Sequence, residues 1–251
     1  MNQPLDTRML QELNSRKSAF PIDEDLLLRH TASSPDPDVL RFIGMLVLWQ
    51  QPRHIFVFGC GPSVIFLSRL RQRLAGQTES AMFAIDHSQR CIGETRRALG
   101  GSSDVHLVHA PLAVTECAGR VFTTYHPGYK RAIPPDVSYD LVFIDGPPAF
   151  RYGREATLYH LESHLAPDAL IVLDDANTEH GQEALLNWQR TWPDRFEALQ
   201  FPEVGNGIAV LRIGAAHRAD RVPGLERQDP ADLDRVITFL TAEGGVFADG
   251  R

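Results

Sequence analysis

Hydrophobic and polar positions alternate between two patterns from residue 54 to residue 213. Short apolar runs typical of buried strands are separated by segments in which apolar residues recur at helical spacing. This alternation predicts parallel strands joined by right-handed crossovers. The expected strands are 54–58, 81–85, 105–109, 140–144, 169–173, 196–201 and 207–213, and the expected helices are 63–75, 88–99, a segment ending at His164, and 179–191.

The last two expected strands are separated by the short segment 202–206, which contains Glu203-Val204-Gly205-Asn206. A connection this short, rich in glycine and asparagine, joins antiparallel strands, because a parallel crossover needs a much longer segment. The sequence therefore predicts an α/β, doubly wound and mostly parallel seven-stranded sheet with an antiparallel closing strand.

The residues that precede the sheet carry helical patterns over 5–17, 23–31 and 37–50. Asp36 and Pro37 are suited to the N-cap and the first position of the third helix. These helices predict an N-terminal helical cap. The expected organisation is a cap at 1–52, a cofactor-binding domain at 53–214 and a tail at 215–251 with one helix near 231–242 that either covers the sheet edge or meets a second subunit, as in a homodimer.

A long stretch without a clear period, residues 111–138, interrupts the alternation. Loops of this length inside a compact domain are often functional, commonly as lids or substrate contacts. Its polar side chains His126, Tyr129 and Lys130 are therefore candidates for contact with a substrate.

The segment Ile55–Leu70 combines an apolar strand, a Gly-x-Gly turn and an amphipathic helix. Gly59 and Gly61 lack a Cβ, so the chain can turn tightly there and let a ligand approach its backbone. The second expected strand ends in Asp86, at about the spacing where an acid binds ribose hydroxyls in nucleotide-binding folds. Together these features indicate a nucleotide-type cofactor, whereas each taken alone is equally well explained by local geometry.

Position 64 restricts which cofactor the turn accepts. A dinucleotide fingerprint needs a small residue there so that the helix packs close to the pyrophosphate, but the chain has Val64. This disfavours NAD and FAD and is compatible with a ligand without pyrophosphate, such as S-adenosylmethionine. The chain also lacks the Gly-Lys-Ser/Thr sequence of a P-loop.

Composition narrows the class of partner. The chain has 251 residues, 43% of them hydrophobic, and a net charge of −7 without a run of basic residues, which argues against nucleic acid or an anionic membrane as the main partner. Its three cysteines have no metal-ligand spacing, and its longest apolar stretch, residues 39–49, is too short to cross a bilayer. We expect a cytoplasmic protein that acts on a small molecule.

Three carboxylates are expected at the ends of adjacent strands: Asp145 after the fourth, and Asp174 and Asp175 after the fifth. Like charges brought together need something to offset their repulsion, and a hard cation such as Mg²⁺ binds oxygen ligands of this kind. A bound Mg²⁺ would lower the pKa of a substrate hydroxyl. Alternatively, these residues only cap helices and turns, or Asp145 faces the cofactor without a metal.

Taken together, the glycine turn, Asp86 and the closing hairpin resemble the class I S-adenosylmethionine-dependent methyltransferases over residues 50–213, with their Rossmann-like fold. VFIDGPPAF followed by LIVLDDANTEH is similar to the metal-dependent O-methyltransferases that act on catechols or on sugar hydroxyls. The resemblance implies Mg²⁺ on Asp145, Asp174 and Asp175. It implies an S-adenosylmethionine site that we assign to Gly59, Cys60, Gly61, Ser63, Asp86, His87, Ala110 and Asp145.

The chain departs from this family at three positions. Val57 replaces the acid that helps to hold the amino group of the cofactor, and Pro147 and Pro148 stand where the sugar-modifying and catechol-type enzymes have a base. The sequence therefore leaves open metal activation alone, a different side chain as base, or a different reaction. The candidates for the base are His126, Tyr129 and Lys130 in the long loop and His180 after the fifth strand, and we assign catalysis to Asp145, His126 and His180.

Other functions remain open from the sequence alone. The same cofactor could donate its aminocarboxypropyl group instead of its methyl group, because Gly-Cys-Gly-Pro resembles part of the nicotianamine-type synthases. The replacements Val57, Pro147 and Pro148 also fit a degenerate protein that binds a ligand without catalysis. Arg151 and Arg154 either pair with a substrate carboxylate or form solvated ion pairs.

Overall fold

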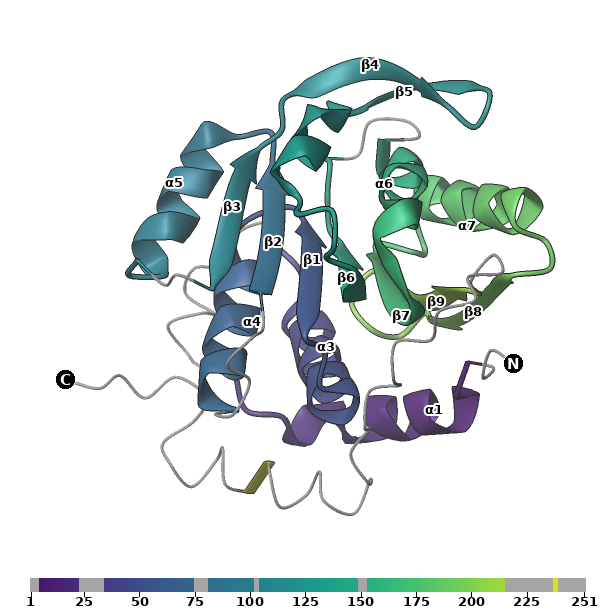
Figure 1. Ribbon diagram of the computed structural model, residues 1–251. Coiled ribbons are helices and arrows are strands. Elements are labelled where there is room, and N and C mark those ends of the chain that lie inside the picture. Colours follow the sequence, from purple (N-terminus) through teal and green to yellow (C-terminus); the bar gives the residue numbers. More distant parts are fainter. Residues whose placement is uncertain are drawn as a thin grey trace.

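A seven-stranded sheet forms the centre of the protein (Figure 1). The computed structural model describes residues 5–22, 34–74, 81–101, 104–148, 153–214 and 237–238. The strand order is β3-β2-β1-β6-β7-β9-β8, and β9 runs antiparallel to both of its neighbours while the other six strands are parallel. The strands are β1 (His54–Phe58), β2 (Ala81–Asp86), β3 (Val105–His109), β6 (Tyr139–Ile144), β7 (Leu165–Asp174), β8 (Phe196–Phe201) and β9 (Ile208–Ile213).

This arrangement confirms the predicted mostly parallel sheet and its antiparallel closing strand. The connection between β8 and β9 is short, as predicted, and Gly205 and Gly207 both adopt positive φ there. Glycine adopts a positive φ in such a turn at little cost, because it has no Cβ.

Helices cover both faces of the sheet (Figure 1). They are α1 (Thr7–Arg16), α3 (Pro37–Gln50), α4 (Pro62–Arg73), α5 (Gln89–Ala98), α6 (Gly153–Leu161) and α7 (Glu179–Thr191), with short 3-10 helices at Lys17–Ala19, Pro127–Ala132 and Glu162–His164. Successive strand residues serve opposite layers: Ile55 and Val57 pack with α1, α3 and α4, whereas Phe56 and Phe58 pack with α6 and α7. Both faces of the sheet are thus buried, as parallel sheets require.

Helix α3 begins where the sequence predicts. The side chain of Asp36 accepts a hydrogen bond from the backbone N–H of Asp38 at 2.8 Å, and Pro37 occupies the first turn. Residues 39–50 of the helix are almost entirely buried and join the hydrophobic cluster that contains β1 and α4. The described part of the predicted cap therefore shares one core with the sheet. The expected helix at 23–31 and most of the expected helix at 231–242 lie outside the described residues.

The prediction of an irregular loop over 111–138 is wrong. That stretch contains a two-stranded antiparallel hairpin, β4 (Leu112–Cys117) and β5 (Arg120–Tyr125), separate from the main sheet. In Figure 1 it arches across one end of the molecule. Phe122 and Thr124 are buried against the rest of the protein, whereas Val114 and Val121 are exposed. The strands of the hairpin therefore alternate between buried and exposed residues. The turn residues Ala118 and Gly119 have φ values of 50° and 70°, which suit a tight hairpin.

The register of the sheet aligns the strand ends that matter for function. Ile85, Phe58, Ile144 and Leu173 are paired across β2, β1, β6 and β7. The residues that follow them, Asp86, Gly59, Asp145 and Asp174, must therefore form a row along one edge of the sheet. Crevices beyond the carboxyl ends of parallel strands are where open α/β sheets bind their ligands.

No helix in the described part of the chain has the length and apolar character needed to span a membrane.

Candidate functional site

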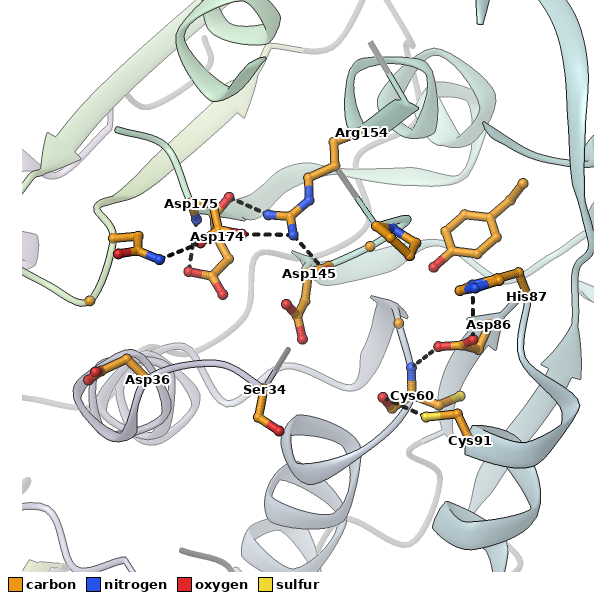
Figure 2. A pocket seen from close by; sticks show the side chains of 16 residues that line it. Ser34, Asp36, Cys60, Asp86, His87, Cys91, Asp145, Arg154, Asp174 and Asp175 are labelled. Atoms are coloured by element: carbon orange, nitrogen blue, oxygen red, sulfur yellow. Dashed lines mark hydrogen bonds and ion pairs between the residues drawn. The ribbon is translucent and has the colours of Figure 1, made fainter. Parts of the chain in front are cut away.

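A cavity of about 570 Å³ lies at this edge of the sheet (Figure 2). It combines five carboxylates with one guanidinium, and its walls come from the glycine turn, the ends of β2, β6 and β7, and the segment before α3. The lining residues are Ser34, Asp36, Gly59, Cys60, Asp86, His87, Cys91, Tyr125, Asp145, Gly146, Pro148, Arg154, Asp174, Asp175, Gly205 and Asn206.

The glycine turn between β1 and α4 needs both of its glycines. Gly59 and Gly61 have φ values of 109° and 128°, which L side chains rarely adopt. A Cβ on Gly59 would also lie 3.6 Å from the carbonyl carbon of Asp145, whereas a Cβ on Gly61 would have open space. Gly61 is therefore required by backbone conformation alone, and Gly59 also brings the turn close to the end of β6.

Asp86 links this turn to the start of α5. Its two carboxylate oxygens accept hydrogen bonds from the backbone N–H of Cys60 at 2.9 Å and of Ser88 at 2.7 Å. The ring of His87 lies beside the same carboxylate, with Nδ1 3.2 Å from Oδ1. Each carboxylate oxygen has a further lone pair, so the held side chain can still accept hydrogen bonds from a ligand.

Asp145 directs its carboxylate into the cavity (Figure 2). The backbone N–H of Asp145 donates to the carbonyl of Phe58 at 3.0 Å, which continues the sheet ladder and fixes the residue. Burial, followed by the negative charge of Asp174, raises the pKa of Asp145 well above its usual value, and the guanidinium of Arg154 opposes that rise. A carboxyl group in this environment has a stronger affinity for a proton than an exposed one.

Arg154, from the first turn of α6, holds the loops after β6 and β7 together (Figure 2). Its guanidinium donates to the backbone carbonyl of Asp145 at 3.0 Å and of Asp174 at 2.8 Å. It also forms an ion pair with the carboxylate of Asp175 at 2.8 Å and a longer contact with the carbonyl of Pro147 at 3.4 Å. Of the two alternatives for Arg154, the structure shows an ion pair within the protein, but one that is mostly buried, since only 16% of its side chain is exposed. Arg151 lies outside the described residues.

The acids after β7 are both engaged within the protein. One carboxylate oxygen of Asp174 accepts from the backbone N–H of Asp175 at 2.9 Å, and Asp175 also accepts from the side-chain amide of Asn206 at 3.2 Å. Burial and the charge of Asp175 raise the pKa of Asp174 to about 6. Asp175 has a φ of 55°, in the left-handed region, and its carboxylate pairs with Arg154.

The structure brings together most of the residues predicted for the site and leaves others outside it. Gly59, Cys60, Asp86, His87, Asp145, Asp174 and Asp175 line the cavity, whereas Gly61, Ser63 and Ala110 are not among its lining residues. Ser63 is fully buried in α4, and the backbone N–H of Ala110 donates to the carbonyl of Asp86 at 2.9 Å.

The loop and histidine candidates for a base lie away from the cavity. His126 is exposed and accepts a hydrogen bond from the backbone N–H of Gly128, while His180 lies 3.7 Å from Glu183 on the surface of α7. Tyr129 packs in the core, and Lys130 is not among the lining residues. None of these four residues is among those that line the pocket.

Several lining residues were missed by the sequence interpretation. Tyr125 ends β5, and its hydroxyl lies so close to Gly146 that a Cβ there would collide with it. Asp36 was recognised only as a helix cap, and Asn206 only as a turn residue. Cys91, on α5, donates from its thiol to the carbonyl of Cys60 at 3.2 Å. Recognising the hairpin would have located Tyr125; the other contacts depend on tertiary packing.

The carboxylates do not form the predicted Mg²⁺ site. Among the described residues, no three His, Cys, Asp or Glu side chains are grouped as metal ligands would be. Mg²⁺ requires near-octahedral oxygen ligands. Here one carboxylate faces the cavity, one is hydrogen-bonded to its own loop and one is paired with a guanidinium. The residues present therefore do not fit the ion that the sequence implied.

Comparison with known proteins supports the fold. No protein-family model and no curated protein matches the chain in sequence. The methyltransferase PaMTH1 of Podospora anserina, solved with bound S-adenosylhomocysteine (SAH), has a TM-score of 0.59 at 14% identity and covers 85% of this chain and 98% of that chain.

Two further solved structures are similar. An O-methyltransferase of Bacillus cereus in complex with SAH has a TM-score of 0.54 at 15% identity over 84% of this chain and 92% of that chain. A methyltransferase of Geobacter sulfurreducens has a TM-score of 0.54 at 19% identity over 84% and 98%. The chain thus has the Rossmann-like methyltransferase fold, which confirms the predicted resemblance at the level of the fold.

Proposed function

We propose that the protein transfers a methyl group from S-adenosylmethionine to a hydroxyl of a small, polar acceptor. The observation that carries this proposal is the row of Asp86, Gly59 and Asp145 along the carboxyl edge of the sheet, at the mouth of an acidic cavity. The fold shared with two SAH-bound methyltransferases supports it.

The nucleoside part of the donor would lie over the glycine turn. The missing side chains at Gly59 and Gly61 leave the backbone accessible, and Asp86 presents fixed carboxylate oxygens to the ribose hydroxyls. Because Asp86 is already held by two backbone N–H groups, it needs little reordering when a ligand arrives. Preorganisation of this kind lowers the cost of binding.

The charge of the cavity favours the donor over the product. S-Adenosylmethionine carries a sulfonium and an ammonium group, and five aspartates against one arginine line the cavity. Methyl transfer removes the sulfonium charge. The attraction between the pocket and the spent cofactor is therefore weaker than its attraction for the donor, which promotes product release.

Asp145 is the side chain best placed for chemistry. Its carboxylate faces the cavity beside the glycine turn, and its raised pKa makes it a better proton acceptor than an ordinary aspartate. We assign it the role of accepting the proton of the acceptor hydroxyl as the oxygen attacks the methyl group in line with the departing sulfur. Bringing the reactants together in this orientation supplies much of the remaining acceleration.

The described wall also indicates the kind of acceptor. Beyond the glycine turn, the cavity is lined by Ser34, Asp36, Asp175, Asn206 and other small or polar residues. Carboxylates and amides bind hydroxyl groups, and the carboxylates repel anions. A saccharide or another hydroxyl-rich metabolite fits this wall better than an anionic acceptor does.

Product analysis tests the proposal. The protein is incubated with S-adenosylmethionine labelled in its methyl group and with a panel of neutral polyols, amino sugars and catechols. Mass spectrometry should find SAH and a labelled methyl ether. Asp145→Asn should reduce turnover by roughly 10²-fold or more, the usual contribution of a general base, while SAH binding stays within a few-fold of the wild type. Methylthioadenosine as product would instead indicate aminocarboxypropyl transfer and contradict the proposal.

A further inference from the structure

We infer that Arg154 is a positioning residue that supplies, as part of the chain, the positive charge that a divalent metal ion would otherwise bring to the ends of β6 and β7. The inference rests on the proposed function, because it concerns the same pocket. It describes how that pocket is held together, so it can be tested without measuring enzyme turnover.

The contacts of Arg154 bridge the two loops that carry the acids. Its guanidinium binds the backbone carbonyls of Asp145 and Asp174 and the carboxylate of Asp175. The planar guanidinium has five N–H donors in a fixed fork, and the described contacts use four of them. A cation that joins carbonyl and carboxylate oxygens from two strand-end loops occupies the structural position of a shared metal ion.

Only one of the three acids, Asp175, offers its carboxylate to this guanidinium, while Asp145 and Asp174 offer their backbone carbonyls. One oxygen of Asp175 pairs with Arg154 and the other accepts from Asn206, while Asp174 accepts from the backbone of its own loop. Only Asp145 sends its carboxylate into the cavity without such a contact among the described residues. A metal bound by all three would compete with Arg154 and Asn206 for Asp175, because both oxygens of Asp175 already have a partner.

The position of Arg154 explains how the acids can be close together. Like charges repel each other more strongly where the protein partly excludes water. A buried cation among them offsets this repulsion, and a side chain cannot dissociate as a metal ion can. The guanidinium also sets the distance between the β6 and β7 loops, and so the place of Asp145 relative to the glycine turn.

Metal binding and its dependence on Arg154 test the inference. The full chain, treated with EDTA and then freed of it, is titrated with Mn²⁺ and followed by electron paramagnetic resonance. Thermal unfolding is measured with Mg²⁺ or with EDTA. The variants are Arg154→Met, which removes the charge, and Arg154→Lys, which keeps the charge but loses the fork. Arg90→Met, at a side chain of α5 that is 87% exposed, is the control.

We expect the wild type, Arg154→Lys and Arg90→Met to bind no stoichiometric Mn²⁺ at millimolar concentration and to show the same melting temperature in Mg²⁺ and EDTA. Arg154→Met should melt lower and be partly restored by Mg²⁺, because the acids then lack their cation. If Arg154→Met does not fold, the wild type and Arg154→Lys still decide the matter.

Stoichiometric Mn²⁺ binding by the wild type that is lost in Asp145→Asn would overturn the inference. So would a folded Arg154→Met protein whose stability does not respond to Mg²⁺, because Arg154 would then hold the loops without a charge role. SAH affinity measured on the same samples separates this failure from failure of the proposed function, since a protein without SAH binding fails the latter whatever its metal response.

Discussion

At the residue scale, Arg154 connects the two strand-end loops of the site through the backbone carbonyls of Asp145 and Asp174. Asp86 and Asp145 were found from the sequence because they directly follow apolar runs, and parallel strands place such positions at one edge. The role of Arg154 could not be found this way. It depends on carbonyl groups of Asp145 and Asp174, which lie on two separate loops. The histidines His126 and His180 show the converse, because residue type alone does not bring a side chain to a pocket.

Buried His160 on α6 gives a prediction about acid stability. Burial, and secondarily the charge of Lys130, lowers the pKa of His160 from 6.5 to about 4, and 7% of the residue is exposed. Between these two values the unfolded chain takes up a proton that the folded chain does not, so stability falls as the pH drops from about 6.5 to about 4 and this contribution is constant below it.

Replacement by glutamine should remove that dependence. Between pH 7 and pH 4.5 the free energy of unfolding decreases in both proteins. We expect the decrease to be smaller in His160→Gln than in the wild type, by on the order of 2 kcal/mol. Urea denaturation at the two pH values measures this. His106→Gln, at an exposed histidine, should behave as the wild type does. Parallel pH profiles for the wild type and His160→Gln would show that His160 is not buried as described.

At the scale of elements, the sequence predicted the strands and helices whose hydrophobic residues recur with a clear period. It missed the hairpin of β4 and β5, whose pattern is weak. The main sheet was recovered because its strands are continuous apolar runs buried on both faces. The hairpin of β4 and β5 was missed because only one of its faces is buried, so its apolar residues are sparse and its turn carries Ala118 in place of the usual asparagine. Because the hairpin was missed, Tyr125, which ends it, was also missed as a residue that lines the cavity.

The turn of this hairpin yields opposite predictions for two neighbouring residues. Gly119→Ala should lower the free energy of unfolding by roughly 1 kcal/mol, because a φ of 70° strains a residue with a Cβ. The added Cβ would meet no atom within 4 Å, so strain alone is tested. Ala118→Asn should raise the free energy of unfolding by roughly a few tenths of a kcal/mol, because asparagine tolerates positive φ better than alanine does. Equilibrium denaturation that finds the same sign for both would contradict the described turn.

At the scale of the whole molecule, charge and topology act together. The chain has a net charge of −7, and four of its aspartates reach one cavity because they follow or end strands whose ends share a register. The segment before α3 contributes Ser34 and Asp36 to the same cavity. Residues far apart in sequence therefore make one anionic pocket, suited to a cationic cofactor and a neutral acceptor.

Calorimetric titration of the purified chain with S-adenosylmethionine and SAH tests this account most directly. We predict that the wild type binds one equivalent of each, that Asp86→Asn weakens both by tenfold or more while remaining folded by thermal melting, and that the exposed control Asp194→Asn binds as the wild type does. A folded wild type that binds neither compound, or an Asp86→Asn variant with unchanged affinity, would contradict the claim that this row of strand ends is a cofactor site.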